Sequence, residues 1–207
     1  MSSRTVVFEL LCYWHVGSGR GAAALADAVV ARDDTGLPLI PGRTVKGLLR
    51  DAMELAAAAG AIPADRVQQW FGSGIPGGET DDGEERERHM ESGRYATVPG
   101  HLWFGSAVLP AAWAAWARGA DAEAASVKAS LFDYVASTAI DGQGMAREHT
   151  LRVREVAVPM TLRAPVHGPE GDDTWVGDLE AAVPLLRCLG TRRQRGLGRV
   201  RVTVEAP

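Results

Sequence analysis

The chain has 207 residues, of which 46% are hydrophobic and 23% are charged, and its net charge at pH 7 is −4, so it is long enough to bury a substantial core. The sequence contains neither an apolar run of membrane-spanning length nor a basic-then-apolar signal pattern, and we therefore expect a cytoplasmic protein with no membrane partner. Its two cysteines, Cys12 and Cys188, lie far apart in apolar segments, which excludes a disulfide framework and a paired-cysteine zinc site.

The first predicted element is a strand over residues 5–15. Its apolar face consists of alternate residues: Val6, Phe8, Leu10, Cys12 and Trp14. Such alternation is typical of a strand with one face on the core and the other face open. His15 ends the open face, where it is either accessible to a ligand or buried with its polar atoms satisfied.

The segment over residues 36–60, GLPLIPGRTVKGLLRDAMELAAAAG, predicts a tight turn followed by a helix. Two X-Pro steps precede Gly42, and we expect Gly42 to adopt a positive φ in this turn. Thr44 is the expected cap of a helix over residues 44–59. An apolar stripe at helical spacing packs this helix on the core: Val45, Leu48, Leu49, Ala52 and Met53.

Three cations, Arg43, Lys46 and Arg50, lie off that stripe near the start of the helix. Helix N-termini attract anions, so this pattern indicates either an anion site or a surface helix that is basic at one end. A nucleotide-binding P-loop is excluded, because Leu48 takes the place of the required lysine.

Two long insertions are predicted, over residues 61–99 and 110–150. The first is a glycine-rich loop in which residues 79–91 include seven acidic and two basic residues. The second is alanine-rich and predicts a short helix. Further strands are predicted over residues 102–109, 152–165 and 199–205, and a helix capped by Asp178 and shortened by Pro184 is predicted over residues 178–189.

The resulting order is strand, helix, strand, strand, helix, strand. This order predicts an α+β protein with a ferredoxin-like (RRM-like) βαββαβ core, the scaffold of RNA-recognition modules. The whole chain is predicted to be one domain with two insertions.

The loop over residues 190–198 combines glycines at 190, 196 and 198 with Arg192, Arg193 and Arg195. Glycines allow a close approach of the backbone, and guanidinium groups match the geometry of phosphate oxygens. Residues 187–201 include six arginines and no acidic residue, which favours a phosphate-binding loop over an ordinary basic loop.

Three stretches together resemble the RAMP superfamily of CRISPR-associated proteins: the strand that ends in His15-Val-Gly, the block over residues 37–50, and the loop over residues 193–198. The resemblance spans nearly the whole chain and is strongest to the backbone subunit of type III (Csm/Cmr) effector complexes. It implies binding of guide CRISPR RNA and complementary target RNA, and assembly with other RAMP subunits and copies of itself in a filament. It also implies that one insertion forms a thumb-like projection.

The resemblance further implies the roles of individual residues. Asp27 precedes Arg32-Asp33 at the family's spacing, so it is expected to cleave target RNA with Mg²⁺ or another divalent metal that it binds. RNA-binding roles are implied for His15, Arg43, Lys46, Arg50, Arg192, Arg193, Arg195, Gly196 and Gly198.

Two alternatives remain open from the sequence. One is a structural RAMP subunit of the same kind of complex that does not cut RNA. The other is a guide-processing RAMP endoribonuclease with His15 as general acid or base, against which the resemblance of residues 37–47 to the backbone subunits argues.

Overall fold

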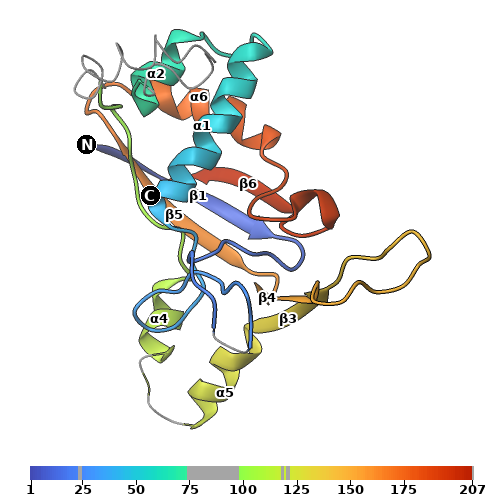
Figure 1. Cartoon of the computed structure of the whole chain (residues 1–207). Coiled ribbons are helices and arrows are strands. Elements are labelled where there is room, and N and C mark those ends of the chain that lie inside the picture. Colours follow the sequence, from blue (N-terminus) through green and yellow to red (C-terminus); the bar gives the residue numbers. More distant parts are fainter. Residues whose placement is uncertain (23–24, 74–97, 118, 120–121, 207) are drawn as a thin grey trace, which may run out of the picture.

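A computed structural model of the protein describes residues 1–22, 25–73, 98–117, 119 and 122–206. Its main sheet is antiparallel and has the strand order β2-β5-β1-β6 (Figure 1). These strands are β1 (Ser2–Leu10), β2 (Trp103–Phe104), β5 (Thr161–Gly168) and β6 (Val200–Glu205). Helix α1 (Gly42–Ala58) follows β1, and helix α6 (Thr174–Ala182) follows β5. This is the ferredoxin-like βαββαβ arrangement, which confirms the predicted fold class.

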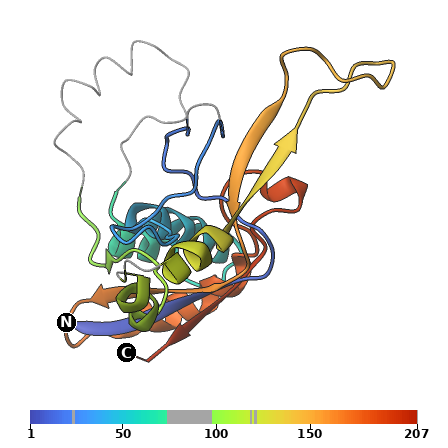
Figure 2. The same cartoon turned by 90° about the horizontal axis from the view of Figure 1, so that it is seen from below.

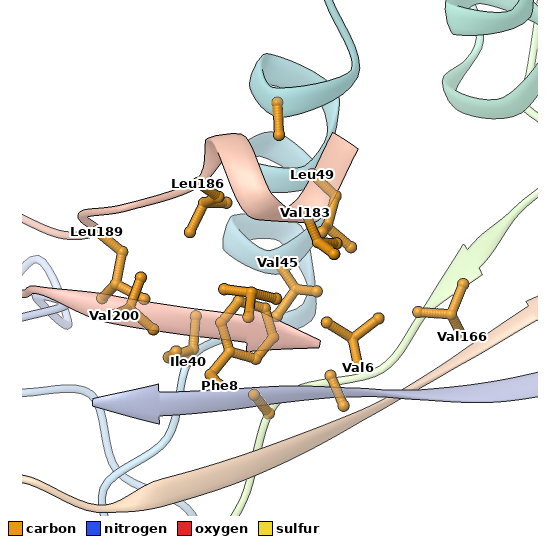
Figure 3. Close-up of a cluster of buried hydrophobic side chains, with 14 of the residues drawn as sticks. Val6, Phe8, Ile40, Val45, Leu49, Val166, Val183, Leu186, Leu189 and Val200 are labelled. Carbon is orange, nitrogen blue, oxygen red and sulfur yellow. The ribbon is translucent and has the colours of Figure 1, made fainter. Parts of the chain in front are cut away.

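The core lies between one face of this sheet and the helices α1 and α6, which lie on the same side of it (Figure 1). Val6 and Phe8 of β1 and Val45 and Leu49 of α1 are all fully buried, and Figure 3 shows them in one cluster. The predicted alternation faces the core within β1, which ends at Leu10 and not at the predicted residue 15, and the half-buried Cys12 lies beyond it. The predicted apolar stripe of the helix also faces the core. Each large buried side chain of this kind stabilises the fold by about 1.5–3 kcal/mol.

The opposite face of the sheet is polar and its charges are paired. Leu162, Ala164 and Val166 of β5 are buried, whereas the residues between them are exposed. On the exposed side, a nitrogen of Arg163 lies 2.6 Å from a Glu205 carboxylate oxygen. Similarly, a nitrogen of Arg201 lies 2.9 Å from a carboxylate oxygen of Glu9. The charges of this face therefore largely neutralise one another.

The start of α1 differs from its sequence prediction. The helix begins at Gly42, and Thr44 lies inside its first turn, where its N–H donates to the carbonyl of Pro41 at 2.8 Å. Gly42 has no positive φ. A glycine is needed here because a Cβ would lie 2.6 Å from the carbonyl oxygen of Phe104. Gly42 is thus a close-packing residue between α1 and β2, and Thr44 is not the cap.

The predicted strand over residues 152–165 is wrong as a single element. It consists of β4 (Arg152–Ala157) and β5, which belong to different sheets. Pro159 lies between them and has no backbone N–H to continue a ladder. β4 pairs with β3 (Phe132–Ser137) in a two-stranded sheet.

We call residues 132–157 the arm. It consists of β3, β4 and the loop that joins them, and it projects away from the main sheet in both views (Figures 1 and 2). β3 lies inside the predicted second insertion over residues 110–150, whereas β4 lies beyond its predicted end. Exposed apolar side chains lie along it, including Tyr134, Ile140, Met145 and Leu151.

The predicted helix over residues 178–189 also needs correction. It begins earlier, at Thr174, and ends at Ala182, where Pro184 lies in a short 3-10 turn, η1 (Val183–Leu185). Asp178 is therefore inside the helix and is not its cap. Its carboxylate instead accepts a hydrogen bond from the indole N–H of Trp70 at 2.7 Å. The shortening effect of Pro184 is as predicted.

The insertions contain helices as well as loops. The first contains α2 (Asp65–Phe71), and its acidic run at residues 79–91 lies outside the described residues. The second contains α4 (Ala111–Ala117), α5 (Ala122–Ser130) and β3. The strand predicted over residues 102–109 is regular only in β2, and its end continues as two isolated bridges, one between Ala107 and Ile40 and one between Val108 and Arg163. In the described part of the chain, no helix is long and apolar enough to cross a membrane.

Two glycines of α1 test the packing at its start. A Cβ at Gly42 would meet the backbone of β2 at 2.6 Å, whereas a Cβ at Gly47 would meet nothing within 4 Å. We expect Gly42→Ala to destabilise the protein by about 1–3 kcal/mol through overpacking. Gly47→Ala is expected to stabilise it by up to about 1 kcal/mol through helix propensity. Urea unfolding of both variants checks this, and equal effects of the two substitutions would contradict it.

Candidate nucleic-acid interface

The segment over residues 26–32 runs alongside β4 at the root of the arm. The N–H of Asp27 donates to the carbonyl of Val153 at 2.8 Å, and the N–H of Glu155 donates to the carbonyl of Ala28 at 3.0 Å. Ala28 and Arg154 form a parallel bridge. The segment that contains the predicted catalytic aspartate is therefore hydrogen-bonded to a strand more than a hundred residues away in the chain.

A buried carboxylate fixes this segment further. Glu155 is 2% exposed, and its Oε2 accepts the N–H of Val30 at 2.9 Å. Its Oε1 accepts a guanidinium N–H of Arg32 at 2.7 Å. The same guanidinium lies 3.5 Å from the centre of the Phe132 ring, which is a cation–π distance. A buried charge of this kind is tolerated only when it is paired and hydrogen-bonded, as it is here.

The carboxylate of Asp27 is itself half exposed, at 51% of its side-chain surface. Its Oδ2 accepts the N–H of Val153 at 2.8 Å, so the side chain has a defined orientation. Its Oδ1 lies 3.9 Å from a nitrogen of Arg152. The second carboxylate oxygen thus remains available to a ligand at the root of the arm.

The residues around Asp27 offer a metal ion few ligands. In the described part of the chain, no three His, Cys, Asp or Glu side chains are grouped so that they could hold a cation. Mg²⁺ in nucleic-acid enzymes is often bound by one or two carboxylates together with substrate phosphates and water. The donor set at Asp27 therefore fits a cation shared with an RNA phosphate and does not fit one held by the protein alone.

His15 does not lie on an open face. It is 2% exposed, and its Nδ1–H donates to the carbonyl oxygen of Glu155 at 2.7 Å. Burial lowers the pKa of His15, the bond to the Glu155 carbonyl opposes this, and the positive charge of Arg154 adds to the lowering. Of the two alternatives left open by the sequence, His15 is the buried histidine with a hydrogen-bonded ring. The ring would have to move before it could stack on a base.

The glycine-rich loop over residues 190–198 packs against the end of the first strand segment. Gly190, with φ of 77°, is so close to the His15 carbonyl that a Cβ would lie 2.2 Å from it. Gly198, with φ of 72°, is equally close to the Leu189 carbonyl, at 2.0 Å. These two glycines therefore allow close approach to the protein's own backbone rather than to a ligand. Gly196 differs, since a Cβ there would meet nothing within 4 Å.

The backbone of this loop is also less available than the sequence suggested. The N–H of Thr191 donates to His15 O at 3.0 Å, and the N–H of Gly198 donates to Tyr13 O at 2.8 Å. The arginine side chains remain available. Arg193 and Arg195 are exposed, Arg192 is half-buried, and none of the three has an ion-pair partner within the described residues.

The cations at the start of α1 form a separate group. Arg43 is exposed, whereas Arg50 is paired with Glu54 at 2.8 Å on the same helix. The N–H of Gly42 donates to the hydroxyl of Ser106 at 3.1 Å, so a donor that an anion would need is already used. No hydrogen bond or ion pair in the described ranges joins this group to the Asp27 segment or to the 190–198 loop. The chain just before α1 is nevertheless tied to the Asp27 segment, since the N–H of Leu39 donates to the carbonyl of Ala31 at 3.0 Å.

Asp27, His15 and the 190–198 loop, by contrast, are connected. The loop bonds to the His15 carbonyl, the His15 ring bonds to Glu155, and Glu155 fixes the segment that contains Asp27. Sequence reasoning missed Glu155 and Arg154 at the centre of this group. Both lie in an alternating run that reads as an ordinary strand, and no local signal distinguishes them.

The sequence profile of the RAMP superfamily matches residues 7–201. The chain belongs to the RAMP superfamily. This confirms the family predicted from the sequence. No curated protein matches the chain.

Solved structures resemble this RAMP protein in fold over almost its whole length. A chain of type III-B Cmr-beta in the apo state is 13% identical, with a TM-score of 0.68 and coverage of 98% of this chain and 97% of that chain. A chain of type III-B Cmr-beta bound to cognate target RNA is 12% identical, with a TM-score of 0.65 and coverage of 99% and 97%. A chain of a type IV-B CRISPR complex is 17% identical, with a TM-score of 0.56 and coverage of 99% and 90%.

The ion pair at Glu155 can be tested against an exposed pair. Arg32→Ala leaves a nearly buried carboxylate without its cation, and we expect a loss of about 1–3 kcal/mol in the free energy of unfolding. Arg163→Ala breaks a pair whose side chains are 44% and 47% exposed, and its expected loss is about 0–1 kcal/mol. Chemical denaturation of the two variants measures the difference. A loss for Arg32→Ala no larger than that of the control would show that Glu155 does not depend on its partner.

Proposed function

We propose that this RAMP protein is a guide-RNA-binding backbone subunit of a type III CRISPR ribonucleoprotein, and that it cleaves complementary target RNA with Asp27. Membership of the superfamily and the fold shared with chains of CRISPR complexes support the first part. One of those structures is of a complex bound to cognate target RNA, which is a partner we also propose here.

The observation that carries RNA binding is the unneutralised charge of the 190–198 loop. Arg192, Arg193 and Arg195 have no acidic partner in the described part of the chain, and the glycine-dependent backbone holds them in a defined turn. Guanidinium groups bind phosphate oxygens in pairs, and such contacts position an RNA strand without reading its bases. Arg43 and Lys46 at the start of α1 provide a second group of cations for the same strand or for a neighbouring subunit.

Asp27 supports the cleavage part of the proposal. In an RNA strand held so that a 2′-oxygen is in line with the adjacent phosphate, that oxygen attacks phosphorus and the bond to the 5′-oxygen breaks. The Val153 N–H orients the Asp27 carboxylate and leaves Oδ1 for the reacting strand. A divalent cation such as Mg²⁺, bound by Asp27 and the phosphate, would supply positive charge where negative charge develops.

A second candidate is a structural subunit that does not cut RNA. The specific observation in its favour is that Asp27 has a single free oxygen, which faces Arg152 at 3.9 Å. A guide-processing endoribonuclease with His15 as general acid or base is not proposed, because the ring is 2% exposed and its Nδ1 is bonded to a carbonyl.

The proposed partners are guide CRISPR RNA, complementary target RNA, other RAMP subunits and further copies of this chain in a filament, all in the cytoplasm. β2 and β6 each have a strand on only one side within the sheet, although at the start of β6 the N–H of Val200 donates to the carbonyl of Arg187 at 3.0 Å on the outer side. Edges of this kind pair readily with other chains. The projecting arm is a further element that extends beyond the core (Figure 2).

The arginine loop makes a prediction about salt dependence. Replacement of Arg192, Arg193 and Arg195 together by alanine should reduce the slope of log K against log salt concentration by about 2–3, because up to three phosphate contacts are lost. Filter binding of a single-stranded RNA at several salt concentrations measures the slope. Arg201→Ala is the control, since Arg201 is paired with Glu9 on the sheet face. An unchanged slope in the triple variant would place the loop outside the RNA interface.

Asp27 makes a prediction that separates a cutting subunit from a structural one. Asp27→Asn keeps an oxygen for the Val153 N–H but removes the charge, and it should reduce target cleavage by about 100-fold or more while guide and target binding persist. The assay uses the assembled complex, Mg²⁺ and a labelled complementary RNA, and evenly spaced products are expected from the unmutated complex. Asp34→Ala, at an exposed turn residue nearby, should cut normally.

Cleavage by Asp27→Asn at the unmutated rate would show that this aspartate is not the catalytic residue. An intact target after incubation with the unmutated complex and Mg²⁺ would instead favour the structural subunit. Thermal unfolding of each variant provides the fold control, with expected shifts below about 1 kcal/mol for a surface carboxylate.

A further inference from the structure

Arg154, on β4 at the root of the arm, has an unusual environment for a half-buried cation. Its Nε is buried and has no hydrogen-bond partner in the described part of the chain. Its terminal nitrogens form no ion pair or hydrogen bond there either. An unpaired, partly buried donor is costly to the fold, and such a group in a native structure needs an explanation.

Three paired arginines differ from Arg154 in this respect. Arg32 has Glu155 at 2.7 Å, and Arg163 has Glu205 at 2.6 Å. Even the exposed Arg152 has Asp27 within 3.9 Å. Of these four arginines, Arg154 is the one whose guanidinium has no acceptor within the described residues, and an anion with several oxygens suits its fork geometry.

Arg154 lies close to the segment that contains Asp27. Arg154 forms a parallel bridge with Ala28, the residue that follows Asp27. It also lies on the same face of β4 as Arg152, about 6–7 Å further along the strand. Arg152 is the residue whose guanidinium faces Asp27. The positive charge of Arg154 in addition reaches His15, whose pKa it helps to lower.

We propose that Arg154 binds a phosphodiester of an RNA strand at the root of the arm, next to the segment that contains Asp27. The proposal rests on the proposed RNA binding of this protein but not on cleavage by Asp27. Its ligand chemistry is a singly charged phosphodiester, whose two non-bridging oxygens accept the paired donors of the guanidinium. Guide and target strands both supply this group, and the experiment distinguishes them.

The test removes one phosphate charge at a time. Assembled complexes with unmutated protein, Arg154→Gln or Arg154→Lys are titrated with complementary target RNA that has a neutral methylphosphonate at one position. A parallel series places the methylphosphonate in a synthetic guide. In the unmutated complex, neutralisation of the phosphate at Arg154 should weaken target binding about 10- to 100-fold.

In Arg154→Gln, RNA without the modification should bind about 10- to 100-fold more weakly, and the methylphosphonate at that one position should have no further effect. Arg154→Lys keeps the charge but lacks the paired donors, so it should retain part of the effect. Arg163→Gln, on the paired sheet face, should behave like the unmutated protein at every position. If the methylphosphonate effect is lost in Arg154→Gln only in the target series, Arg154 binds the target strand. If it is lost only in the guide series, Arg154 binds the guide strand.

The stability of the free protein distinguishes phosphate binding from a purely structural role of Arg154. A structural role predicts that Arg154→Gln destabilises the protein, whereas phosphate binding predicts that it does not. Since the donors of Arg154 have no partner within the described residues, Arg154→Gln should unfold at the same urea concentration as the unmutated protein or a higher one. A clear loss of stability in both Arg154 variants would overturn the proposal. So would a result in which each methylphosphonate, in target or guide, weakens target binding by Arg154→Gln as much as it weakens binding by the unmutated complex. The methylphosphonate effect could be lost in Arg154→Gln although the unmutated complex does not cleave RNA. That result would support phosphate binding by Arg154 and contradict cleavage by Asp27.

Discussion

The buried carboxylate of Glu155 is the interaction on which the candidate site depends. It joins β4 to a loop segment more than a hundred residues earlier, through Val30 at 2.9 Å and Arg32 at 2.7 Å. Removal of a carboxylate from water is costly, and this cost is offset only while both partners remain in place. The pairing therefore admits one register of the segment against the strand, and that register determines where the Asp27 carboxylate lies.

The same strand connects the site to the rest of the molecule. At its end, Ala157 exchanges hydrogen bonds with Trp14, and Leu10 of β1 donates to the carbonyl of Met160 at 2.8 Å. The carbonyl of Glu155 holds the buried His15 ring, and the His15 carbonyl in turn holds the glycine-rich loop. The arm, the Asp27 segment and the arginine loop thus share one hydrogen-bonded framework. A ligand bound at any of these three places would therefore contact residues of the same hydrogen-bonded framework.

The distribution of paired charges bears on which surface of this ferredoxin-like fold would face RNA in the proposed function. RNA-recognition modules commonly use the open face of their sheet. In this protein that face has the ion pairs Arg163–Glu205 and Arg201–Glu9, which neutralise its arginines. Within the described residues, the guanidinium groups of Arg154 at the root of the arm and of Arg192, Arg193 and Arg195 in the 190–198 loop have no acidic partner. We therefore place the proposed RNA path at the junction of the loop and the arm, away from the sheet face.

Much of the fold followed from the sequence alone, because periodicity is a local property. The alternation of the first strand, the apolar stripe of α1 and the order of elements each depend on residues close together in the chain. The sequence also located the arginine-rich loop. The break between β4 and β5, the burial of His15 and the placing of Asp27 beside Val153 were decided only in three dimensions. Each depends on partners 126 or 140 residues apart, or on a choice between two sheets, and no short-range pattern encodes such a contact.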